Sequence, residues 1–280
     1  MLHSFGPWVG KIEEAGDCIT ERQTRQMAAT LGLDPHMVTK TGVLPPLWHW
    51  MGWLNDTPMA GLGPDGHPAK GGFLPPVPLP RRMWAGGRLQ FHHPLRIEEP
   101  LRRRSEILQI SVKAGSAGDM VFVTVGHQIY GETGLAVEEQ QDIVFMAMPA
   151  QFVLPAPVIA AAAPVWVQHE AMSTVRLFRY SALTFNAHRI HFDLPYAVDV
   201  EKYPGLVVHG PLQAMLLMAA ACQRNPKAKV ASFRFRGIRP LFQFDALRLM
   251  GWDVTDGSQT LATVIDGDVT CMQAQIGWQP

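Results

Sequence analysis

Residues 211–223, PLQAMLLMAAACQ, decide the fold of this 280-residue chain. Pro211 suits the first turn of a helix, where its missing N–H leaves no hydrogen bond unmade. The apolar residues that recur at helical spacing are Leu212, Met215, Leu216, Ala219 and Ala220. Further apolar residues fill the other sides, and a helix that is apolar nearly all round is buried. The stretch therefore predicts a central helix enclosed by other elements.

Runs of strand character follow this helix to the end of the chain. They are ASFRFRGI (231–238), ALRLMGWDV (246–254), QTLATVID (259–266) and VTCMQAQIGW (269–278). Asp256-Gly257 and Asp266-Gly267 lie between runs, where tight hairpins need residues that tolerate positive φ. Upstream, a short strand is expected around Leu177–Leu183. One buried helix beside about four antiparallel strands predicts a sheet wrapped around a helix.

The first half of the chain repeats this pattern. Residues 20–33 predict a helix with Thr20 as N-cap, Gln23 completing a capping box and Gly32 as the stop. Residues 44–83 are rich in Pro, Gly and Trp, which predicts a long ordered segment without regular secondary structure. An antiparallel meander is expected from about Leu89 to Phe145.

The two halves together predict an α+β fold of the double hot dog type, with two antiparallel sheets each wrapped around a central helix. Residues 148–165 carry four prolines and predict a crossing linker. We expect an N-terminal half at residues 1–150, a linker at 151–165 and a C-terminal half at 166–280. Trp48, Trp50 and Trp53 are expected to pack in the core between the halves rather than to line a pocket.

Composition excludes several classes of function. Lys and Arg number 24 against 24 Asp and Glu, so no overall charge attracts nucleic acid or an anionic membrane. The three cysteines are widely separated, which argues against a disulfide framework and a cysteine metal site. The start of the chain has neither a basic segment nor an apolar run, and no stretch reaches membrane-spanning length. A cytoplasmic protein without a bound cofactor is expected.

Residues 177–215 hold the residues that predict chemistry. The amide of Asn186 can hold a water molecule, and His191 can move protons near neutral pH. Unpaired backbone N–H groups at a helix start near Gly210 can bind a developing oxyanion. These parts suffice to add water to an activated double bond. His188 and His191 alone make only a weak metal signal, and no metal is expected.

Two long motifs in this region, YSALTFNAHRIHFDLPYA (180–197) and YPGLVVHGPL (203–212), resemble the MaoC-like, or hydratase-2, family of enoyl-thioester hydratases and dehydratases. The similar branch contains mesaconyl-C4-CoA hydratase, itaconyl-CoA hydratase and type 2 hydroxyacyl-thioester dehydratase. Shorter matches at 44–51, 82–96 and 138–145 extend the resemblance over nearly the full length. It implies a hydro-lyase acting on a coenzyme A thioester, with citramalyl-CoA as the hydrated product, and a homodimer.

The wider family pattern, Asp-x-Asn-Pro-aliphatic-His, ends on His191 in this sequence. Three positions depart from it: Asn186 stands for the aspartate, His188 for the asparagine and Arg189 for the proline. The branch itself reads NAHRIH, so the departure is a branch feature. The replacement of the aspartate by Asn186 leaves the identity of the general base open, because an amide orients water but cannot take up its proton. The resemblance implies an active site in the C-terminal half, with the N-terminal half covering the acyl tunnel.

The remaining candidates have two interpretations each. Asp193 either replaces the missing carboxylate or caps the short helix that follows it. His209 is expected to fix the turn before the helix by hydrogen bonding. Candidate contacts to coenzyme A phosphates or to a distal substrate carboxylate are Tyr180, Arg189, His209, Arg234 and Arg236.

Overall fold

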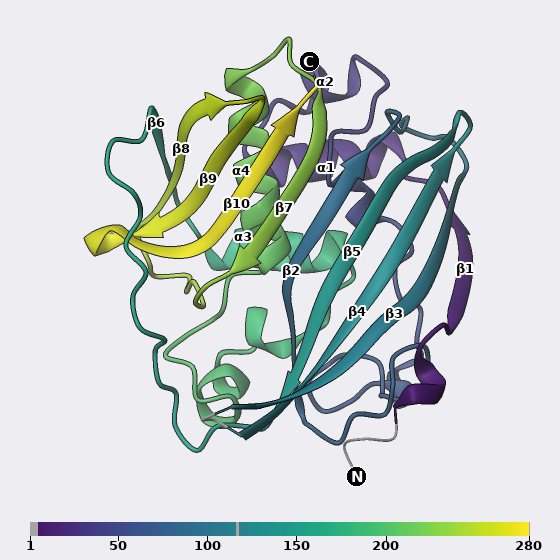
Figure 1. Cartoon of the computed structure of the whole chain (residues 1–280), viewed down its shortest axis with the longest axis vertical. Coiled ribbons are helices and arrows are strands. Elements are labelled where there is room, and N and C mark those ends of the chain that lie inside the picture. Colours follow the sequence, from purple (N-terminus) through teal and green to yellow (C-terminus); the bar gives the residue numbers. More distant parts are fainter. Residues whose placement is uncertain (1–4, 116–117, 280) are drawn as a thin grey trace.

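The computed structural model describes residues 5–115 and 118–279. Its ten strands form one antiparallel sheet in the order β1-β3-β4-β5-β2-β7-β10-β9-β8-β6 (Figure 1). The N-terminal strands are β1 (Ile12–Asp17), β2 (Arg81–Phe91), β3 (Leu101–Gly115), β4 (Gly118–Gly131) and β5 (Gly134–Met146). The C-terminal strands are β6 (Trp166–Glu170), β7 (Val230–Gly237), β8 (Leu247–Thr255), β9 (Ser258–Ile265) and β10 (Val269–Trp278). The α+β double hot dog is confirmed, but its two expected sheets are continuous.

The seam between the halves is the pairing of β2 with β7. It runs in antiparallel register from Gly86 opposite Arg236 to Gln90 opposite Ser232. Gly86 is required there, because a Cβ would lie 2.5 Å from the carbonyl oxygen of Phe235. The backbones of the two halves therefore approach closely without a side chain between them.

The α-helices are α1 (Glu21–Leu31), α2 (Pro35–Thr39), α3 (Thr174–Leu183) and α4 (Gly210–Arg224). The capping box expected at Thr20 is present: its hydroxyl accepts from the N–H of Gln23 at 3.2 Å, and the Gln23 side chain accepts from the Thr20 N–H at 2.9 Å. Gly32 ends α1 at φ 78°. Among the described residues, no helix is long and apolar enough to cross a membrane.

The strand expected at 177–183 was wrong, because these residues form α3. The aromatic and branched side chains favoured a strand, but Leu177, Tyr180 and Ser181 are the buried residues and recur at helical spacing. The hydroxyl of Ser173 caps the helix by accepting from the N–H of Arg176 at 3.2 Å. Tertiary burial of one helical face thus outweighs local β propensity.

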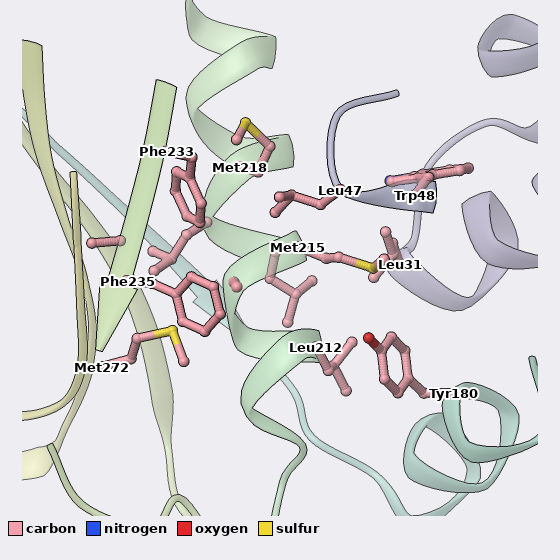
Figure 2. Packing of buried hydrophobic residues seen from close by; sticks show 14 of the residues in the cluster. Leu31, Leu47, Trp48, Tyr180, Leu212, Met215, Met218, Phe233, Phe235 and Met272 are labelled. Atoms are coloured by element: carbon pink, nitrogen blue, oxygen red, sulfur yellow. The ribbon is translucent and has the colours of Figure 1, made fainter. Parts of the chain in front are cut away.

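Helix α4 is central, as expected, and packs against β8, β9, β10 and β2. In Figure 2, Phe233, Phe235 and Met272 lie on its sheet side, and Leu47, Trp48 and Leu31 lie on the other. Segment 44–83 contributes to this core, with Leu47 fully buried and Trp48 2% exposed. Burial on both sides explains why the helix lacks a polar face.

The hairpins match the sequence in part. Asp256 and Gly257 have φ of 49° and 71°, as the tight turn between β8 and β9 requires. In the second turn, the residues with positive φ are Gly267 and Asp268, one position later than expected. The segment 151–165 carries no helix or strand and runs over the surface, with an isolated bridge from Ile159 to Val269.

Candidate active site

A cavity of about 650 Å³ lies between segment 49–68 and the loop that follows α3. Residues of both halves form its wall. Those that matter for the chemistry are His67, Tyr180, Ser181, Asn186 and Pro211. Trp50 and Trp53 also line it while they pack against the core, so the expected core packing holds for all three tryptophans, but only Trp48 of the three is absent from the cavity wall. The cavity thus has an aromatic wall and several polar groups.

Asn186 is placed on the wall by a tight turn after α3. Its Oδ1 accepts from the N–H of His188 at 3.0 Å, and its own N–H donates to the carbonyl of Ser181 at 2.8 Å. The Oδ1 bond fixes the direction of the amide. The side chain is therefore held in one orientation beside the cavity.

His191 is 7% exposed and lies next to this turn, although it is not itself part of the wall. Its Nδ1 donates to the carbonyl of Val207 at 2.7 Å, so Nε2 is the nitrogen left to accept a proton. Burial, and then the neighbouring His209 and His188, lower the pKa of His191 well below its usual value. The ring is neutral at pH 7 and can act as a base.

His209 stacks on His191 with ring centroids 3.6 Å apart. Its Nε2 is bonded to Ser181 Oγ at 2.9 Å, so it ties the start of α4 to α3 rather than fixing its own turn. Burial lowers the pKa of His209 to about 3. Tyr180 lies 4.8 Å from the same ring, and among the described residues its hydroxyl has no hydrogen-bond partner.

Gly210 is the first residue of α4, and His209 occupies the N-cap position without a side-chain cap bond. The next residue, Pro211, lies on the cavity wall and has no N–H. The first turn of a helix presents unpaired N–H groups and a partial positive charge. The structure therefore places an uncapped helix start beside the cavity.

Asp193 and Arg189 are occupied with each other. Arg189 Nε and Nη2 lie 2.9 and 2.8 Å from Asp193 Oδ2, and Asp193 Oδ1 accepts from the Tyr196 N–H at 3.1 Å. The backbone bond, followed by the Arg189 guanidinium, lowers the pKa of Asp193. Of the two interpretations, the bond from the Tyr196 N–H favours capping, because Asp193 directly precedes the helical residues 194–200. The structure does not bring it to the cavity.

Arg234 and Arg236 are exposed on β7, while the alternating Phe233 and Phe235 are buried on the side of α4. They share one face, as their spacing indicates, but it is the outer face of the sheet. Neither lies on the cavity wall.

Two polar groups from the first half were missed. Asp65 and His67 meet through an Oδ2–Nδ1 contact of 3.0 Å, and His67 lies on the cavity wall next to the Asn186 turn, with its ring centroid 4.3 Å from that of His188. Their sequence, GPDGHP (63–68), lies within the Pro- and Gly-rich segment 44–83, whose composition predicts only irregular structure. With His188 they form the one group among the described residues whose donor atoms could hold a metal ion, all within 4.8 Å of one another.

The second missed group surrounds Glu139 on β5, which is 3% exposed. Its carboxylate is bonded to His49 Nε2 at 3.0 Å, Trp50 Nε1 at 3.0 Å and Gln141 Nε2 at 2.9 Å. Burial raises the pKa of Glu139, but these bonds outweigh it and the net shift is downward. A satisfied, buried carboxylate therefore supports the cavity wall from the N-terminal half.

Residues 47–243 match the family model described as hydroxyacyl-thioester dehydratase type 2. The chain belongs to this family. A mesaconyl-C(4)-CoA hydratase from Chloroflexus aurantiacus is 47% identical over 249 residues, which cover 87% of each chain. The mitochondrial hydroxyacyl-thioester dehydratase type 2 of Schizosaccharomyces pombe is 29% identical over 76% of this chain and 79% of its own.

Solved structures agree on the fold of this type 2 dehydratase family member. A MaoC-like dehydratase from Phytophthora capsici superposes with a TM-score of 0.71 at 14% identity, covering 96% of this chain and 95% of that one. A Mycobacterium tuberculosis protein described as a double hotdog fold superposes with a TM-score of 0.60 at 14% identity, covering 96% of each.

Proposed function

We propose that the protein is a hydro-lyase that adds water reversibly to an enoyl-CoA thioester. The observation that carries this proposal is the arrangement of three groups: the fixed amide of Asn186 on the cavity wall, and beside the cavity a neutral buried imidazole and an uncapped helix start. Family membership and 47% identity to a mesaconyl-C(4)-CoA hydratase support it.

The thioester carbonyl makes the β-carbon of such a substrate electrophilic and collects negative charge as an enolate. Asn186 would hold the attacking water, and His191 would exchange a proton through Nε2. The Gly210 N–H at the start of α4 would bind the enolate oxygen, aided by the helix dipole. Each role uses a group that lies at or beside the cavity.

The proposed substrate is mesaconyl-C4-CoA or itaconyl-CoA, with citramalyl-CoA as the hydrated product. Support comes from the Chloroflexus relative. The second candidate is dehydration of straight-chain 3-hydroxyacyl thioesters, which the name of the yeast relative favours. We also propose a cytoplasmic location and a homodimer. Light scattering of the purified protein tests the homodimer.

A substrate panel tests the function. The purified protein is incubated with mesaconyl-C4-CoA, itaconyl-CoA and crotonyl-CoA, and enoyl absorbance where present, free thiol and product mass are followed. A product heavier by one water without thiol release is expected. Thiol release would indicate a thioesterase, and binding without conversion an inactive acyl-CoA-binding protein; either would contradict the proposal.

His191→Ala is expected to lower kcat at least about 100-fold, the scale of acid/base catalysis. His169→Ala, on the exposed face of edge strand β6, is the control and is expected to retain wild-type kcat. Unchanged turnover of His191→Ala would exclude His191 from the mechanism.

A further inference from the structure

The turn at residues 63–68 in the N-terminal half is fastened onto the loop that carries Asn186. The carbonyl of Asp65 accepts from the backbone N–H of Arg189 at 3.0 Å, and the Pro64 carbonyl accepts from its guanidinium at 3.0 Å. Gly66 lies so close to Ala187 that a Cβ would stand 1.9 Å from the Ala187 carbonyl oxygen. The two loops therefore hold a fixed relative position.

His67 is held rigidly within this turn. Its Nδ1 donates to Asp65 Oδ2 at 3.0 Å, its backbone N–H donates to Asp65 Oδ1 at 3.1 Å, and its carbonyl accepts from Gly63 at 2.7 Å. Its ring packs against that of His188 with centroids 4.3 Å apart. Because Nδ1 is occupied by Asp65, Nε2 is the nitrogen available for a proton.

The reaction needs a proton acceptor for the attacking water, and Asn186 cannot be that acceptor. We propose that His67, oriented by Asp65, is the catalytic base that takes the proton of the attacking water. This inference rests on the proposed hydration. It gives the N-terminal half a catalytic residue in place of the covering role expected of it.

The Asp65 carboxylate suits this role because it can stabilise the imidazolium that forms. Burial raises its pKa, but the hydrogen bonds and the charge of His67 outweigh this and lower it to about 2. Burial also lowers the pKa of His67 to about 4, against the opposing effect of Asp65. The resting pair is thus an anion beside a neutral imidazole, ready to accept a proton.

The proposed step balances as follows in the direction of hydration. An O–H bond of water breaks and its proton goes to His67 Nε2, while the oxygen forms a bond to the β-carbon. The π electrons of the double bond move to the thioester oxygen as an enolate. His191 Nε2 takes a proton from solvent and passes it to the α-carbon of the enolate, which returns His191 to its neutral resting form. His67 releases its proton to solvent, so one water is added in total.

The Asp65–His67 contact also argues against a metal ion at these residues. Asp65 Oδ2 and His67 Nδ1 are already joined in a hydrogen bond. An ion bound by both would have to break this bond, whereas proton transfer uses it. Dependence of activity on a metal is therefore an outcome that would contradict the proposal.

The test compares three variants under saturating substrate. His67→Asn, whose amide nitrogen can take the place of Nδ1, is expected to lose kcat at least about 100-fold while keeping substrate affinity within a few fold. Asp65→Asn is expected to lose about 10-fold or more, with its pH profile shifted. His92→Ala removes a surface histidine that pairs with Glu138, and it is expected to match the wild type.

A second readout separates catalysis from structure. In D₂O the α-proton of the hydroxyacyl thioester can exchange when His191 removes it and a deuteron returns. This exchange does not require the β-hydroxyl to leave. His67→Asn is expected to retain this exchange while losing dehydration, and His191→Ala is expected to lose both. A merely structural role for His67 would abolish both activities together.

Three results would overturn the inference. They are wild-type kcat in His67→Asn, parallel loss of exchange and dehydration in that variant, and loss of wild-type activity on removal of metals with a chelator. In each case hydration by the untreated wild-type enzyme would still stand. Absence of hydration by the wild type would instead refute the proposed function.

Discussion

The imidazole rings of His191 and His209 lie stacked, with centroids 3.6 Å apart and planes at 20°. Two protonated rings at this separation would repel strongly inside a buried site. The stack therefore opposes protonation of both rings, and burial lowers the pKa of each.

This stack predicts loss of stability in acid. Both pKa values lie below the value of about 6.5 in the unfolded chain, so the unfolded state binds more protons as pH falls below that value. Between pH 7.5 and 5 the free energy of unfolding is expected to fall by up to about 2 kcal/mol for each such histidine. Urea unfolding at the two pH values measures this. His209→Asn is expected to reduce the difference, and the exposed His36→Asn is expected to leave it unchanged.

The contact of Gly66 with Ala187 predicts a large effect of one methyl group. Gly66→Ala is expected to lower the free energy of unfolding by more than about 2 kcal/mol, because both positive φ and a backbone clash oppose it. Gly71→Ala is the matched control: its φ is also positive, at 101°, but its nearest neighbour is 3.7 Å away. Thermal unfolding of both variants measures this. Equal losses of stability in the two variants would mean that the contact with Ala187 contributes nothing to the effect.

Adjacent glutamates on β5 predict opposite outcomes. Glu139→Ala leaves His49 and Trp50 without their acceptor and is expected to cost about 3–5 kcal/mol of stability. Glu138→Ala removes an exposed pair with His92 and is expected to change stability by less than about 1 kcal/mol. Denaturant titration of both variants checks this, and similar values would contradict the assigned role of Glu139.

The Tyr180→Phe substitution is expected to affect substrate binding without lowering stability. Burial raises the pKa of Tyr180, so its hydroxyl stays a donor, and no described residue accepts from it. Its removal is expected to leave the melting temperature unchanged or slightly raised. If the substrate supplies the missing acceptor, KM is expected to rise about 5- to 10-fold, the worth of one hydrogen bond. An unchanged KM would remove Tyr180 from substrate binding.

Much of the fold could be predicted from local patterns. The capping box at Thr20, the all-apolar α4 and the strand runs after it each carry their own signal. Helix α3 could not be identified in this way, since its aromatic residues favour a strand until the tertiary packing of Leu177 and Tyr180 is known.

The candidate site could be predicted only in part. Asn186, His191 and Gly210 lie in one motif, so their proximity was readable from the sequence. Asp65 and His67 lie more than a hundred residues upstream in an irregular segment, and only the folded chain brings them to the Asn186 loop. Arg234 and Arg236 share a face by strand geometry, but alternation alone does not say which face is turned outward.

The pairing of β2 with β7 has a consequence for any attempt to divide the molecule. Cutting the chain within 151–165 and separating the fragments would strip each of a neighbouring strand and leave a long row of unsatisfied amides and carbonyls. Such fragments would be prone to self-association, and co-expression would be needed to restore the complete sheet and, with it, the cavity that both fragments enclose.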